Sequence, residues 1–162
     1  MEGSRIATAG RRWHSDAMSC PNKSVWGAVE AERAFGKADR ARRRAMLRQR
    51  LLRRCVECAR LRIFDAHAPR RTTGRAGLQE IPLDAITGSL EPHRAAHFDH
   101  EFRPSPVTRC RWLGVWLADQ RGATLPPISV TRIGDGYALR DGHHRVSVAR
   151  ARGALTIPAI VA

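Results

Sequence analysis

The C-terminal half of the chain alternates short apolar runs with segments of helical spacing. Two segments, 107–122 and 142–153, have the periodicity of amphipathic helices, and each ends at a glycine. Four apolar runs are predicted strands: "LQEIPLDAI" at 78–86, "PPISVTRI" at 126–133, "GYALR" at 136–140 and "LTIPAIVA" at 155–162. The two middle strands are joined by the turn "GDG" and form a hairpin. The order strand, loop, helix, hairpin, helix, strand predicts an α+β domain.

A longer apolar pattern with helical spacing runs from Ser24 to about His67. Ser24 can cap a helix, and no proline follows before Pro69. The apolar positions recur at intervals of three, four or seven residues: Ala28, Ala31, Phe35, Ala38, Ala45, Leu52, Val56, Ala59 and Ile63. Arg42 and Gln49 interrupt this apolar seam. We therefore predict a long helical segment with a bend or break near these two residues.

The length of 162 residues suits one ordinary domain with an appendage. We divide the chain into a disordered N-terminus at 1–22, a basic helical segment at 24–67, a linker at 68–77 and an α+β domain at 78–162. No apolar run approaches the roughly 20 residues that cross a bilayer, and the N-terminus lacks the apolar region of a signal peptide. We expect a cytoplasmic protein that has no membrane partner and keeps its four cysteines as thiols.

The net charge of +14 is concentrated in the N-terminal half. Residues 1–79 hold 19 Lys and Arg against 7 Asp and Glu, whereas residues 80–162 hold 10 against 8. One interpretation is a helix packed on the domain with its arginines in water. The other is a basic helix that forms a homodimer through its seam and contacts DNA phosphates. The arginines chosen for that contact are Arg43, Arg44, Arg48, Arg50 and Arg54.

The stretch "DGHHR", residues 141–145, lies between a predicted strand and a predicted helix. Gly142 allows the backbone to approach a ligand closely, and the first helical turn offers free N–H groups and the positive end of the helix dipole. Arg145 could hold phosphate oxygens with two parallel hydrogen bonds, and His143 and His144 add donors. Asp141 could cap the helix, orient a histidine or help to hold a divalent metal. The alternative is a capped helix whose arginine pairs with a nearby carboxylate.

Residues from about 79 to 162 resemble the ParB/sulfiredoxin-like superfamily, in particular the ParB N-terminal domain. "IPLDAI" is similar to the first strand and turn of that family, and "RWLGVWLADQRGATLPPISV" to its helix and following strand. "GYALRDGHHRVSVARARGALTIPAIV" contains its "y.l.dG..R..A...G...ipa.v" signature. The resemblance implies a small mixed sheet with helices, here preceded by the basic helical segment.

The resemblance also implies a nucleoside triphosphate, CTP or ATP with Mg²⁺, held at its phosphates by the loop. The implied binding residues are Asp141, Gly142, His143, His144, Arg145 and Arg94. Arg94 matches an arginine that follows the first strand in ParB domains, and Arg103 is the second candidate. His143 stands where sulfiredoxin has its cysteine and ParB a glutamate, so sulfinic acid reduction is not expected. The function implied is nucleotide binding in a regulatory or DNA-associated protein.

Two alternatives remain. Free serine kinases of the same superfamily carry an Asp-Gly-His-x-Arg loop, which is closer to the one here. A small-molecule phosphotransferase or an NTPase would then use Glu91 as base, with His144 as a second catalytic candidate. The further alternative is a nuclease-like or simple nucleic-acid-binding module, whose affinity would fall steeply with salt.

No metal site is predicted. His93, His97 and His100 lie in a proline-bounded loop without a fixed ligand spacing. Cys55 and Cys58 form a C-x2-C pair inside the basic helical segment, and no second pair follows at zinc-ribbon spacing. Trp112 and Trp116 are four residues apart on a predicted helix, which indicates that they fill the core.

Overall fold

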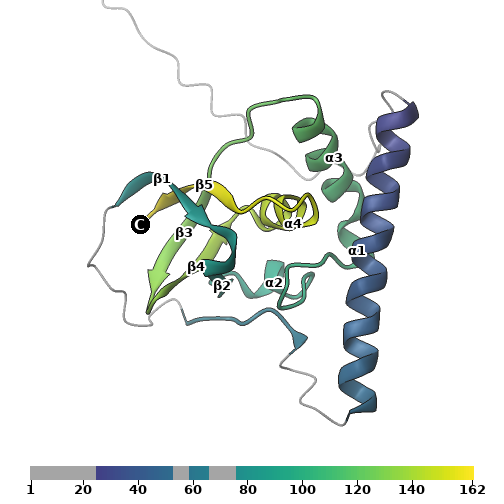
Figure 1. Ribbon diagram of the computed structural model, residues 1–162. Helices are drawn as coiled ribbons and strands as arrows, with labels where there is room; N and C mark the ends of the chain where they lie inside the picture. The colour runs from purple at the N-terminus through teal and green to yellow at the C-terminus, as the bar shows by residue number, and fades with distance from the viewer. Residues whose placement is uncertain (1–24, 53–58, 66–75) are drawn as a thin grey trace, which may run out of the picture.

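Five strands form one mixed sheet in the part of the chain that the structure describes, and helices pack on it in successive layers (Figure 1). The structure is a computed structural model, which describes residues 25–52, 59–65 and 76–162. In spatial order the strands are β1 (Gly77–Pro82), β5 (Thr156–Val161), β3 (Ile128–Ile133), β4 (Gly136–Asp141) and β2 (Ile86–Ser89). The pairs β1–β5 and β3–β4 are antiparallel, and β5–β3 and β4–β2 are parallel. The predicted α+β class is confirmed.

The strands form because apolar residues alternate along them. In β5, Ile157, Ala159 and Val161 are buried and the residues between them are exposed, which is the period of a strand with one covered face. This covered face packs against α4 (His143–Ala151), whose Val146 is fully buried in the same core. The start of α4, which carries the conspicuous histidines, is thereby fixed at the end of β4.

A second apolar cluster joins α4, α3 (Arg109–Gln120) and α1 (Val25–Leu51). The rings of Trp112 and Trp116 are stacked, with centroids 5.2 Å apart. The indole N–H of Trp112 donates a hydrogen bond to Oγ of Ser147 at 2.9 Å, which ties α3 to α4. Figure 1 shows the resulting order from the sheet through α4 and α3 to α1. The predicted core role of both tryptophans is confirmed.

The long basic helix is present and packs on the domain. Ala31 and Phe35 of α1 are buried, and the Phe35 ring meets Trp112 edge-on at 5.5 Å. Glu32 pairs with Arg109 of α3. The apolar seam is therefore used within the chain along the first half of α1, as the packed-helix interpretation expected. A homodimer through this helix stays a prediction and would have to use other surface.

The predicted helical segment is wrong for residues 60–65, which are not helical. Ile63 pairs with Ser89 of β2 in parallel, and the Phe64 N–H donates to the Ser89 carbonyl at 2.8 Å. The exposed edge of β2 offers unpaired backbone groups, and these outweigh the helical spacing of Ala59 and Ile63. The predicted disordered N-terminus lies outside the described residues, as do most of the linker and Val56.

Two further expectations concern the state of the cysteines and membrane-spanning helices. Cys110 is disulfide-bonded, so the expectation of thiols is wrong for this residue, and the other three cysteines lie outside the described residues. Among the helices that the structure describes, none is long and apolar enough to cross a bilayer.

Candidate anion site at the start of α4

Gly142 makes the turn from β4 into α4. Its φ of 109° and ψ of 19° are left-handed, and an added Cβ would lie 2.5 Å from Cγ2 of Ile128. Glycine is therefore the residue that this close turn accepts. No side chain caps α4, so the N–H groups of its first turn and the positive end of its dipole face the site. The predicted strand, glycine and helix arrangement is present.

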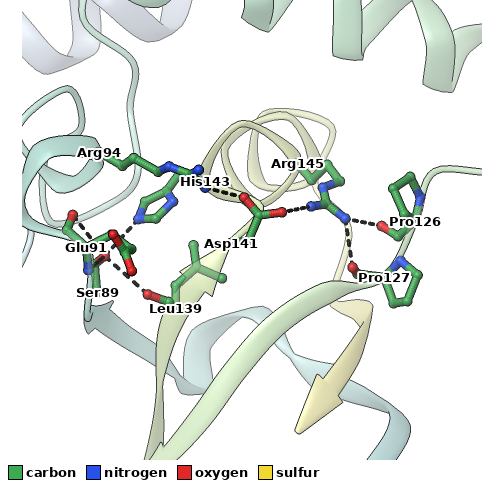
Figure 2. A network of polar contacts seen from close by, with 9 residues as sticks. All are labelled: Ser89, Glu91, Arg94, Pro126, Pro127, Leu139, Asp141, His143 and Arg145. Carbon is green, nitrogen blue, oxygen red and sulfur yellow. Dashed lines mark hydrogen bonds and ion pairs between the residues drawn. The ribbon is translucent and has the colours of Figure 1, made fainter. Parts of the chain in front are cut away.

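Asp141 lies between two arginines from different elements, as Figure 2 shows. Its Oδ1 accepts a hydrogen bond from Arg94, which belongs to α2 (Pro92–Ala95), and its Oδ2 accepts one from Arg145 at 2.7 Å. Burial acts to raise the pKa of Asp141, but the charges of Arg145 and Arg94 outweigh it and hold the pKa below its ordinary value. The carboxylate is thus ionised and belongs to an ion-pair network rather than to a helix cap.

Arg145 is largely committed to protein partners. Besides Asp141, its guanidinium donates to the carbonyls of Pro126 and Pro127, the latter at 2.8 Å. Its side chain is 14% exposed, whereas that of Arg94 is 53% exposed. Arg145 therefore pairs with a nearby carboxylate, as the alternative interpretation of the loop expected. Arg94 is the more accessible of the two arginines.

His143 is a buried link between α4 and β2. Its side chain is 2% exposed, and its Nε2 lies 2.8 Å from Oγ of Ser89. The same hydroxyl accepts the N–H of Glu91 at 2.9 Å and can donate to the Leu139 carbonyl at 3.2 Å (Figure 2). Burial, with the charge of Arg94, lowers the pKa of His143 to about 4. At neutral pH the ring is therefore uncharged.

His144 is half-buried against an aromatic ring. Its ring meets Phe98 edge-on at 5.3 Å, and its Nε2 is buried without a hydrogen-bond partner among the described residues. Burial, followed by the charge of Arg111, lowers the pKa of His144 to about 3. The two histidines therefore shape the loop as neutral groups, and arginines supply the positive charge of the site.

Two members of this site were missed by sequence reasoning. Arg111, in the first turn of α3, is close enough for its charge to act on both His144 and Arg145. Ser89 is the buried partner of His143. Nothing in the local sequence distinguishes Arg111 from the other arginines, because only the packing of α3 against α4 brings it here. Ser89 lies beyond the end of the strand predicted at 78–86, so no local signal marked it.

The remaining candidates are dispersed. Glu91 is exposed at the start of α2 and lies beside Ser89. Arg103 forms ion pairs with Asp99 at 2.7 Å and with Glu101 at 3.1 Å. In the described parts of the chain no three potential metal ligands gather, and the three loop histidines are exposed: His93, His97 and His100. Four of the five arginines chosen for nucleic acid are exposed on α1, and Arg54 lies outside the described residues.

Two hollows, of about 740 and 540 Å³, run along α1 beside residues 101–103. The residues of the "DGHHR" loop line neither of them. The loop is the candidate site, because an open helix end and convergent arginines can bind an anion, whereas a hollow by itself indicates no particular ligand. Arg44 and Arg48 do line the smaller hollow, so part of the basic face of α1 borders it.

Comparison with protein-family models, with curated proteins and with solved structures finds no match to this chain.

Proposed function

We propose that this protein is a ParB-like nucleotide-binding protein, and that it binds the phosphates of a nucleoside triphosphate at the start of α4. One observation carries the proposal: beside the uncapped helix end, Arg94 and Arg145 both pair with Asp141, and the charge of Arg111 acts on His144 and Arg145. The excess of guanidinium groups favours a ligand with several negative charges.

The residues of the site would have distinct roles. Arg94 is the accessible cation and would bind a phosphate directly, together with backbone N–H groups of the first turn of α4. His143, held by Ser89, fixes the direction of that turn. CTP and ATP are the nucleotides we expect, with an accompanying Mg²⁺ held by the phosphates of the nucleotide.

The role proposed for this binding is regulatory or DNA-associated in the cytoplasm, where nucleoside triphosphates are abundant. Exposed Arg43, Arg44, Arg48 and Arg50 on α1 support association with DNA, because they form a basic surface separate from the nucleotide site.

A small-molecule phosphotransferase or NTPase is the second candidate. Exposed Glu91 favours it, because this residue precedes α2, the helix that carries Arg94, and lies beside Ser89 (Figure 2). A carboxylate so placed could accept the proton of a hydroxyl that attacks the terminal phosphate. Phosphate release or transfer that is lost in Glu91→Gln with nucleotide affinity retained would favour this candidate.

Isothermal titration calorimetry with CTP, ATP, GTP and ADP, each with Mg²⁺, tests the proposal. We expect at least one triphosphate to bind, and more tightly than ADP, since the third phosphate adds charge opposite the arginines. Absence of binding by all four nucleotides would overturn it.

A further inference from the structure

We propose that Asp141 is an internal competitor for the anion site, so that the site selects polyphosphates over singly charged anions. The inference rests on the proposed function, because it concerns what binds at the start of α4. It adds a specificity-determining residue, one that the bound ligand displaces instead of contacting.

The position of the carboxylate supports this role. Its two oxygens are bound from opposite sides, by Arg94 on one side and by Arg145 on the other (Figure 2). Arg94 is 47 residues away in sequence, so this contact exists because the fold brings α2 to the end of β4. The carboxylate thus holds the same two guanidinium groups that a phosphate at this helix end would need.

The two contacts differ in how easily they open. Arg145 keeps its bonds to the Pro126 and Pro127 carbonyls when Asp141 leaves, so its guanidinium stays in place. The Arg94 side chain and the Asp141 carboxylate are both about half exposed, at 53% and 52%. Ion pairs with this exposure contribute little and exchange readily with solvent. An incoming anion would therefore bind Arg94 first and displace the Asp141 carboxylate from it.

Competition with Asp141 sets a threshold of charge. Asp141 is tethered beside the arginines, so its effective concentration there is far above that of a free anion. An acetate ion brings the same single charge and has no advantage that offsets this tether. Pyrophosphate or a nucleoside triphosphate brings more charge into the field of Arg94, Arg111 and Arg145, and can displace the carboxylate.

Titration calorimetry with pyrophosphate and with acetate on Asp141→Asn tests the inference. The matched control is Asp119→Asn, which removes the same charge from an ion pair elsewhere, the 2.7 Å contact of Asp119 with Arg152. We expect pyrophosphate to bind Asp141→Asn about threefold to tenfold more tightly than the wild type, in line with the modest strength of exposed ion pairs, and acetate binding to become measurable. Asp119→Asn should match the wild type within about twofold.

Weaker or unchanged pyrophosphate binding in Asp141→Asn overturns the inference, because Asp141 would then position the loop or hold a ligand or metal itself. Asp141→Ser, measured in parallel, gives the same answer if the asparagine variant does not fold. If pyrophosphate and the nucleotides bind none of the proteins, the proposed function fails together with the inference. If they bind the wild type but Asp141→Asn gains nothing, the inference alone fails.

Discussion

The Nε2 atom of His143 lies 2.8 Å from Oγ of Ser89, and this contact joins the first turn of α4 to the end of β2. Both side chains are buried. The histidine that most distinguishes the "DGHHR" loop thus packs inside the fold, whereas the more accessible positive charge beside it belongs to Arg94.

Acid should destabilise the protein below about pH 6.5. In the folded state His143 has a pKa of about 4 and His144 a pKa of about 3, against 6.5 for an unperturbed histidine. The unfolded state therefore takes up protons first, and stability falls as the pH drops from about 6.5 toward 4. Between pH 7.5 and 5 we expect the free energy of unfolding to fall by roughly 2 kcal/mol per histidine.

Urea unfolding at the two pH values measures this change in stability. His143→Gln should show a smaller pH dependence than the wild type, because one of the two groups no longer titrates. Equal stability of the wild type at pH 7.5 and pH 5 would contradict the neutral state of the two rings in the folded protein.

Gly142→Ala should destabilise the protein strongly. The left-handed φ of 109° costs about 1–2 kcal/mol for a residue with a Cβ. The added Cβ would also lie 2.5 Å from Cγ2 of Ile128, so the total should reach about 3 kcal/mol. Gly153→Ala is the control, since Gly153 also has a positive φ, of 74°, but its Cβ would meet no atom within 4 Å. Equal stability of the two variants in urea unfolding would contradict the close approach of the Gly142 backbone to the Ile128 side chain.

Much of the sheet and of the loop could be predicted from the sequence, and most of the side-chain partners could not. Alternation identified β5, and glycine before "HHR" identified the turn into α4, because both are local signals. The contact of Arg94 with Asp141 depends on packing across 47 residues. The segment around Ile63 was predicted as helix because the spacing of its apolar residues carries no information about the unpaired edge of β2.

Phe35→Ala should loosen α1 from the domain. The ring is buried against Trp112, and removal of such a side chain costs about 3 kcal/mol or more. Urea unfolding and limited trypsin digestion measure the effect, and we expect faster cleavage within α1. Leu47→Ala, at an exposed position of the same helix, should change stability by no more than about 0.5 kcal/mol. Unaltered cleavage in Phe35→Ala would show that this contact does not hold α1.

The arginines of α1 should determine any affinity for DNA. Replacing Arg43, Arg44, Arg48 and Arg50 with glutamine should weaken binding to a labelled duplex in fluorescence anisotropy. The slope of log affinity against log salt should fall by about 0.9 for each phosphate that the variant no longer neutralises. Arg121→Gln, at an exposed residue after α3, serves as the control. An unchanged slope in the fourfold variant would favour the interpretation of a helix face that is simply in water.

Nucleotide affinity of Arg94→Gln, measured by titration calorimetry against the wild type and Arg121→Gln, tests the central claim most directly. Removing a charged hydrogen-bond donor to phosphate should weaken binding of the preferred triphosphate about tenfold or more, since such bonds contribute about 1.5–3 kcal/mol. Arg121→Gln should bind as the wild type does. Wild-type affinity in Arg94→Gln would contradict a phosphate site at the start of α4.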